Sequence, residues 1–323
     1  MIQGFACEGG RLRRVDPGTG EFDQVAWIDL VDPTDAEEEE LERRLGINIP
    51  TREEMQEIEI SSRLYQEDGV AFMTAILPAQ TDADYPHVAP VTFVLAGQRL
   101  ITVRYHEPRA FTTFPMRAEK VSTGCEDGAS ILISLLEALV DRLADVLERV
   151  GQDIDRISRG IFEHTGAKPT KTRDFQKVLE EIGRKGDLNS HIRDSLTSLE
   201  RVAGFFTHVA TQRKSGKDLR ERLKTLSRDL RSLSDHSGFL SQKITFLLDA
   251  TLGMINIEQN AIIKIFSVAA VVFLPPTLIA SIYGMNFEMM PELEWLFGYP
   301  FAIGLMILSA ILPFLFFKRR GWL

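Results

Sequence analysis

The stretch that decides the fold is residues 265–282, IFSVAAVVFLPPTLIASI, which is followed at 283–287 by YGMNF. Residues 265–282 carry no formal charge. This segment is about as long as a helix must be to cross a hydrocarbon core of roughly 30 Å. A second uncharged stretch, residues 298–317, follows after a short connection. We therefore predict two membrane-spanning helices joined by a hairpin loop. The alternative is a pair of buried core helices, but two adjacent charge-free segments of this length are rare in soluble domains.

The charges around these segments predict their orientation. The connecting loop, residues 283–299, has no Lys or Arg but contains the three glutamates Glu288, Glu292 and Glu294. Lys264 precedes the first segment, and residues 318–320 are all basic. Because basic residues concentrate on the cytoplasmic side, both termini are expected to be cytoplasmic and the acidic loop is expected to face outward.

Small and polar residues recur on one face of the first segment at alternating intervals of three and four. We call this face the seam, and it consists of Asn260, Ile263, Ser267, Ala270, Leu274, Thr277, Ser281 and Gly284. Such a face is either a helix–helix contact or the wall of a pore, and spacing alone favours the contact. Pro275 and Pro276 remove two backbone donors, so the helix is expected to bend there or to stay exposed to water.

The N-terminal part of the chain, to about residue 120, predicts an α/β domain. A hairpin is expected at 5–15 around Gly9 and Gly10, and a short apolar strand at 25–31. Thr34 with Glu37, and Thr51 with Glu54, are capping-box patterns that open two helices, the first over residues 35–45. Four further strands are expected, at residues 63–65, 70–77, 90–95 and 100–105.

From about Ile131 the apolar residues recur at helical spacing, in a helix that also carries several acidic residues. A break at residues 166–169 separates it from a second helix over 173–212, and Ser215 and Gly216 end the second. A third helix starts near Lys217 and can continue into the membrane without interruption. We therefore expect three parts: a cytosolic α/β domain (1–128), a helical hairpin with a long stalk helix (129–263), and two transmembrane helices (264–323).

Composition excludes several classes of function. The chain of 323 residues has a formal net charge of −9 and lacks the basic patch that nucleic-acid binding requires. No signal peptide is expected, and Cys7 and Cys125 are too few for a disulfide framework. The six histidines show no metal-ligand spacing, and no nucleophile–base pair or phosphate-binding loop is present. The sequence therefore predicts that the protein is not an enzyme and has no resident cofactor.

The residues around the loop resemble a known family. Tyr283–Gly284–Met285–Asn286–Phe287, then the segments MPEL at 290–293 and GYP at 298–300, are similar to the signature of the CorA family of magnesium and cobalt transporters. The segments IEQN at 257–260 and FLPPT at 273–277 resemble its bacterial inner-membrane branch. A short Gly-Met-Asn run alone is a weak signal, but its position at the outer end of the first of two C-terminal spans makes it specific.

This resemblance implies a funnel-shaped homopentamer in the bacterial cytoplasmic membrane, with the first span of each subunit around a central pore. It reverses the preference for a helix–helix contact. The residues that it makes pore-lining are Asn260, Ile263, Ser267, Leu274, Thr277 and Ser281. At the outer mouth it implies a selectivity and ion-binding site formed by Tyr283, Gly284, Met285 and Asn286, in which Gly284 and Asn286 supply oxygen atoms to the ion. Met285 is a poor Mg²⁺ ligand because a thioether is soft and Mg²⁺ is hard, so it is expected to maintain the loop's shape.

The implied function is uptake of hydrated Mg²⁺, and also of Co²⁺ and Ni²⁺, driven by the membrane potential and closed by cytosolic Mg²⁺. Candidate cytosolic ion-ring or sensor residues are Asp229, Asp235 and Asp249, although solvated helix-face charges explain them as well. Two other readings remain open. One is a zinc-transporting relative of the same architecture, and the other is a membrane-anchored scaffold whose spans only associate with each other.

Overall fold

The computed structural model describes residues 1–16, 24–83, 85–162, 172–286, 290–291 and 295–321. The chain divides into two compact units. The first comprises residues 1–168 and 177–248, and the second comprises residues 169–176 and 249–323. The first unit holds a sheet and the helices that cover it, and the second holds two apolar helical segments.

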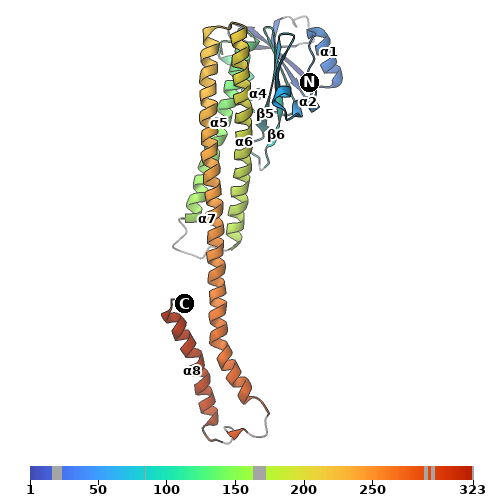
Figure 1. The fold of residues 1–323 in the computed structure, drawn as a ribbon. Coiled ribbons are helices and arrows are strands. Elements are labelled where there is room, and N and C mark those ends of the chain that lie inside the picture. Colours follow the sequence, from blue (N-terminus) through green and yellow to red (C-terminus); the bar gives the residue numbers. More distant parts are fainter. Residues whose placement is uncertain (17–23, 84, 163–171, 287–289, 292–294, 322–323) are drawn as a thin grey trace. The chain divides into compact units, whose positions relative to one another are not determined.

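A seven-stranded sheet lies at the centre of the first unit (Figure 1). Its strand order is β2-β1-β3-β7-β6-β5-β4, and all neighbours are antiparallel except β3 and β7, which are parallel. The strands are β1 (Ile2–Glu8), β2 (Arg11–Val15), β3 (Val25–Val31), β4 (Leu64–Glu67), β5 (Val70–Ala79), β6 (His87–Ala96) and β7 (Arg99–Arg104). The predicted strands are therefore present, with ends that shift by a few residues.

The local signals for turns and helix starts are confirmed. Glu8 pairs with Arg11 across the first hairpin, and Gly9 and Gly10 in its turn have φ of +58° and +77°, which glycine adopts without strain. Helix α1 (Asp35–Leu45) begins at the Thr34 capping box and helix α2 (Arg52–Gln56) begins at the Thr51 capping box. The sequence interpretation missed α3 (Ile60–Arg63) and α4 (Ala110–Lys120), and α4 contains a proline in its interior.

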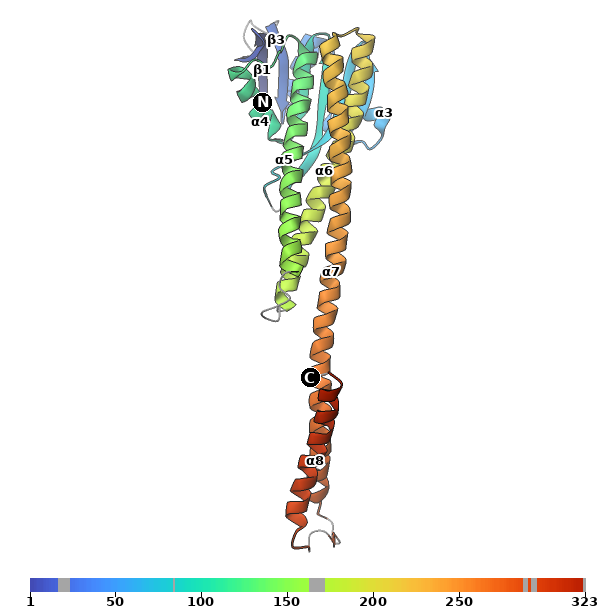
Figure 2. The same ribbon diagram turned by 90° about the vertical axis from the view of Figure 1, so that its left-hand side faces the viewer.

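Helices cover both faces of the sheet. On one face, Leu41 of α1 and Met55 at α2 join a core cluster with Ile28, Ile101 and Val103 of the strands. On the other face lie α4, α5 (Gly128–Phe162) and α6 (Thr172–Gln212) (Figures 1 and 2). There the side chain of Trp27 is fully buried, with its ring centroid 5.9 Å from that of Phe114. The domain is thus a three-layer α/β structure whose apolar strands are buried on both faces.

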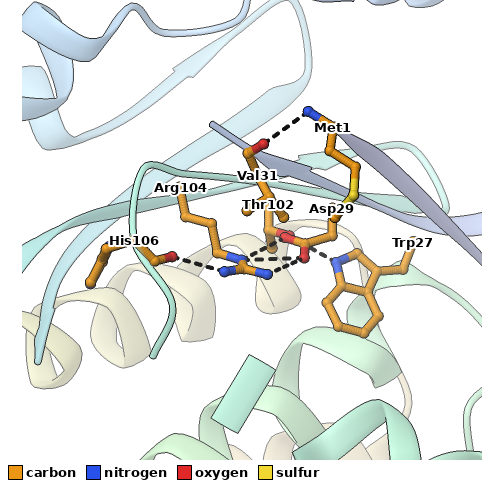
Figure 3. A network of polar contacts seen from close by, with 7 residues as sticks. All are labelled: Met1, Trp27, Asp29, Val31, Thr102, Arg104 and His106. Carbon is orange, nitrogen blue, oxygen red and sulfur yellow. Dashed lines mark hydrogen bonds and ion pairs between the residues drawn. The ribbon is translucent and has the colours of Figure 1, made fainter. Parts of the chain in front are cut away.

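A buried polar network ties the parallel strands β3 and β7 together (Figure 3). Arg104 donates three hydrogen bonds to the two carboxylate oxygens of Asp29, the shortest at 2.9 Å, and a fourth to the carbonyl of His106 at 2.8 Å. Thr102 donates to Asp29 at 2.6 Å and accepts from the Trp27 indole at 2.9 Å. Because each charge is paired and hydrogen-bonded, the network fixes the contact between strands that lie far apart in the sequence.

Two long helical segments follow α6. Helix α7 runs from Lys217 to Tyr283, which confirms that the third helix continues through the first apolar stretch, and α8 covers Gly298–Arg319. Both are long and apolar enough to cross a membrane. The predicted fold class is confirmed, with an α/β domain, a long helix and two C-terminal apolar helices. The break predicted at residues 166–169 lies outside the described residues, and the predicted domain boundaries remain a prediction.

Candidate functional site

The predicted outer site lies where α7 ends. The helix continues through Pro275 and Pro276 and ends at Tyr283. The backbone N–H of Gly284 then donates to the Ala280 carbonyl at 3.0 Å, and that of Met285 donates to the Ile282 carbonyl at 3.2 Å. The remaining carbonyls of the last turn give this end of the helix a partial negative charge, which attracts a cation.

Gly284 and Asn286, the two predicted ion contacts, follow this helix end directly. The Gly284 backbone does not adopt a left-handed conformation, so the cap is not the usual glycine cap. A Cβ added at Gly284 would lie 3.1 Å from the Ala280 carbonyl oxygen and 3.6 Å from that of Ser281, so a side chain at this position would crowd the carbonyls of the last turn. Met285 and Asn286 are exposed. Phe287 and the three loop glutamates lie outside the described residues.

Helix α7 has one partly buried stripe between Val268 and Tyr283. The side chains that the protomer covers there recur at helical spacing, and they are Val268, Ala269, Val272, Pro275, Pro276, Ile279 and Tyr283. Helix α8 has a matching stripe: Gly298, Ala302, Met306, Ser309, Ala310, Pro313 and Phe317. The chain turns back between the two helices, so α8 runs opposite to the end of α7 (Figure 1). We infer that the two stripes face each other, through small residues that allow close packing in a membrane.

The seam lies on the opposite side of α7. At 100° per residue, the centre of the seam lies roughly 180° from the centre of the covered stripe. Every seam residue from Asn260 to Gly284 is exposed in the protomer, with Ile263 at 61% and Leu274 at 65%. The structure thus places all six predicted pore-lining residues on one uncovered face, and α8 does not use that face.

The polar groups of the seam present oxygen atoms. The Thr277 hydroxyl donates to the Phe273 carbonyl at 2.8 Å, so its own oxygen keeps its lone pairs for other partners. Pro275 and Pro276 cannot donate to the carbonyls of residues 271 and 272, but both prolines lie on the covered stripe, so those carbonyls do not belong to the seam. An uncharged helix face with hydroxyl and amide oxygens suits a hydrated cation better than a bare one.

The candidate cytosolic residues do not form one cluster within a protomer. Asp229, Asp235 and Asp249 are all exposed on α7. Asp229 and Asp235 are six residues apart, so they point in different directions. Burial raises the pKa of Asp141 on α5, and the nearby carboxylates of Glu137, Asp145 and Asp229 raise it further. Among the described residues, no group of three or more His, Cys, Asp or Glu is arranged to hold a metal ion.

A buried polar contact between α6 and α7 was not predicted. The amide of Asn189, 1% exposed, donates to the Ser237 carbonyl at 3.1 Å and to the Ser241 hydroxyl at 2.8 Å. Ser237 donates back to the Asn189 carbonyl oxygen at 3.2 Å. A satisfied polar contact of this kind fixes the register of two packed helices. The signal that could have found it is an Asn in line with the apolar positions Ile182, Ile192 and Leu196 of α6.

Comparisons with known proteins point to one family. Residues 22–319 match the family model described as "CorA-like Mg2+ transporter protein". The magnesium transport protein CorA of Pasteurella multocida is 38% identical, and that of Escherichia coli K12 is 39% identical, each over the full length of both chains. The complete structure of the CorA magnesium transporter from Methanocaldococcus jannaschii has the same fold, with a TM-score of 0.78 at 20% identity, and the match covers 100% of this chain and 99% of that one.

Proposed function

The chain belongs to the CorA family of Mg²⁺ transporters, and from this premise we propose that it takes up Mg²⁺ across the bacterial cytoplasmic membrane. Divalent cation transport is the function that the family supports, and the family consists of transporters rather than enzymes. The further specification of Co²⁺ and Ni²⁺ as additional substrates belongs to the proposal. The observation that carries it is the seam of α7, which is uncharged, oxygen-bearing and uncovered, and which leads to the Gly284–Asn286 segment.

The pore is assembled from several copies of the seam, because one helix face cannot enclose a path. We propose a homopentamer, in which five α7 helices turn Ser267, Thr277 and Ser281 toward the axis and α8 lies outside them. The uncovered seam supports this arrangement, since the opposite stripe already has a partner in the same protomer. Asn260 contributes a further polar ring, and Ile263 and Leu274 form apolar constrictions that resist wetting in the closed state.

Selection takes place at the outer mouth. Five copies of Asn286 offer a ring of amide oxygens, and the carbonyls near Gly284 add to it. Mg²⁺ releases its water reluctantly, so neutral oxygen atoms that bind the hydrated ion avoid the cost of stripping it. Tyr283 and Met285 position the ring from either side of Gly284. The loop lies on the outer side of the membrane and both termini lie in the cytoplasm.

Cytosolic Mg²⁺ closes the pore in this proposal. The exposed carboxylates of Asp229, Asp235 and Asp249 are the candidate ligands, contributed by different subunits. Carboxylates that meet at a subunit boundary repel one another when no cation is bound, so the closed assembly loosens as Mg²⁺ falls. An ion shifts this equilibrium only because it binds the closed state more tightly.

The test is ion flux into liposomes that contain the purified full-length protein and a Mg²⁺-sensitive dye. Wild type is expected to take up Mg²⁺, and Asn286→Ala is expected to lose at least about tenfold of the rate, equivalent to roughly 1.4 kcal/mol of lost stabilisation. Leu296→Ala, a change at a 90% exposed loop residue outside the motif, is the matched control and is expected to keep the rate.

Three outcomes contradict the proposal in different ways. Flux of Zn²⁺ without flux of Mg²⁺ would assign the protein to a zinc-transporting relative. Full activity of Asn286→Ala would remove the selectivity ring from the proposal. Inactivity of the intact assembly with every ion would favour a membrane-anchored scaffold.

A further inference from the structure

The two cysteines of the chain lie together in the α/β domain. Cys7 is on β1 and Cys125 lies between α4 and α5, so they are far apart in the sequence. In the structure the Cys7 thiol donates a hydrogen bond to the Cys125 sulfur. No spacing in the sequence predicts this contact. The fold therefore brings together the two groups of the chain that can join covalently.

Backbone hydrogen bonds fix the contact between the two thiols. The carbonyl of Gly10, in the turn between β1 and β2, accepts from the N–H of Thr123 at 2.9 Å and from that of Cys125 at 3.4 Å. Beyond Cys125, the N–H of Gly128 donates to the Gln98 carbonyl at 2.6 Å. The segment that carries Cys125 is thus attached on both sides, which holds its sulfur next to that of Cys7.

The two thiols differ in their access to solvent. Cys125 is 2% exposed. Cys7 is half-buried and lines an open cavity of about 770 Å³, whose other walls include the turn between β6 and β7 and the end of β4. This volume lies in the range of small-molecule sites. A small reagent in the cavity therefore reaches Cys7 but not Cys125.

The cavity beside Cys7 is acidic. Three carboxylates line it, those of Glu67, Asp68 and Glu126, and among the described residues Arg99 is the lining side chain with a positive charge. An excess of one charge in a concave site raises the local concentration of small molecules with the opposite charge. A positively charged reagent is therefore enriched beside Cys7 relative to a negatively charged one.

Both thiols are protonated at neutral pH. Burial raises the pKa of each, and for Cys7 the hydrogen bond to Cys125 and the charges of Asp127 and Glu126 raise it further. The same hydrogen bond acts in the opposite direction on the pKa of Cys125. Because the thiolate is the nucleophile, the pair reacts slowly and responds only to an abundant oxidant.

We propose that Cys7 and Cys125 are a redox-active pair, which a small, positively charged disulfide oxidises to an intramolecular disulfide. The Cys7 thiol loses its proton and attacks one sulfur of the reagent, so one reagent thiol leaves and a mixed disulfide forms at Cys7. Cys125 then loses its proton and attacks the Cys7 sulfur, and the second reagent thiol leaves. Two protein thiols are oxidised, and one reagent disulfide is reduced to two thiols. The new bond joins β1 to the segment that leads into α5, and it does not depend on the proposed transport.

The test is treatment of detergent-purified full-length protein with cystamine, a disulfide with two ammonium groups, followed by intact-mass analysis. Wild type is expected to lose two hydrogens and to retain no adduct. Cys125→Ser is expected to stop at a mixed disulfide on Cys7, and Cys7→Ser is expected to stay unmodified at Cys125. Oxidised wild type is also expected to melt several degrees higher than reduced wild type, because the bond closes a long loop in the unfolded chain.

The charge of the cavity is tested by the ratio of two oxidation rates. At low salt, cystamine is expected to oxidise wild type about tenfold or more faster than the anionic disulfide of glutathione does. Glu126→Gln is expected to reduce this ratio by about threefold or more. Glu119→Gln is the matched control, since it removes the same charge from an exposed position on α4 outside the cavity, and it is expected to keep the ratio.

Several results would overturn the proposal. Wild type that keeps both thiols in millimolar cystamine would do so, as would a mixed disulfide that persists in wild type. Modification of Cys125 at the same rate with and without Cys7 would remove the first step. A disulfide between two copies, seen as a dimer in non-reducing electrophoresis, would replace the intramolecular bond. A rate ratio that Glu126→Gln leaves unchanged would contradict the preference for a cationic reagent.

Discussion

At the scale of single residues, His106 is a buried titratable group whose charge state depends on the folding of the α/β domain. Its ring is buried, one nitrogen contacts the Leu77 carbonyl at 2.9 Å, and Nδ1 has no hydrogen-bond partner among the described residues. Burial lowers the pKa of His106 to about 4. The nearby charge of Arg104 and the ring of His87 act in the same direction. The neutral ring, with its proton on the nitrogen that faces Leu77, is therefore the form that the folded domain accepts.

A defined pH dependence of stability follows. The unfolded chain binds a proton at His106 near pH 6.5 and the folded chain near pH 4, so this contribution to stability is complete above about pH 6.5 and is lost as pH falls toward 4. Between pH 7.5 and pH 5 the loss is roughly 2 kcal/mol. We expect thermal melting of wild type to fall more over this interval than that of His106→Gln, which can still donate to Leu77. Equal shifts in the two proteins would show that another group dominates the acid sensitivity.

At the scale of elements, α7 presents two faces with different surroundings. The stripe that contains Val272 and Ile279 is covered within the protomer, and the seam that contains Ser267, Leu274 and Ser281 is not. If the seam lines a pore, water reaches it, and a cysteine placed there ionises to the reactive thiolate. A cysteine on the covered stripe lies among apolar groups, where ionisation is unfavourable.

Cysteine reactivity therefore distinguishes the two faces. In a Cys7→Ser, Cys125→Ser background, we expect Ser267→Cys, Leu274→Cys and Ser281→Cys to react with a water-soluble thiol reagent about tenfold or more faster than Val272→Cys and Ile279→Cys. Labelling rates in proteoliposomes measure the difference. Similar rates on both faces, or faster labelling of the covered stripe, would contradict the pore assignment even if the protein transports ions.

The elements that could be predicted from the sequence are those with local signals. The capping boxes at Thr34 and Thr51 fixed helix starts, and the absence of charge over residues 265–282 marked the first apolar segment. The parallel pairing of β3 with β7 had no local signal, because it depends on Asp29 meeting Arg104 across a long stretch of chain. The seam was visible as spacing, but only packing shows which face α8 covers.

At the scale of the whole molecule, the proposed uptake needs no chemical energy. An inside-negative potential of 100 mV contributes about 4.6 kcal/mol to the entry of a divalent cation, which is twice the value for a single charge. The stretches of residues 265–282 and 298–317 contain no carboxylate or amine that would carry a coupled proton. The flux should therefore follow the electrochemical gradient of Mg²⁺ alone.

Proteoliposomes with a controlled membrane potential test whether the Mg²⁺ flux follows its own electrochemical gradient alone. With a K⁺ gradient and valinomycin to set the potential, we expect Mg²⁺ entry to increase from 0 to −100 mV inside, to stop when an opposing potential balances the concentration gradient, and to proceed without ATP. The reversal potential should move by about 30 mV for a tenfold change in the Mg²⁺ gradient, since 1.4 kcal/mol corresponds to a factor of ten and two charges move. A shift near 60 mV would mean that only one net charge crosses per ion. Co-movement of an anion or exchange for a monovalent cation would then replace the simple pore, even though the same α7 seam could line the path.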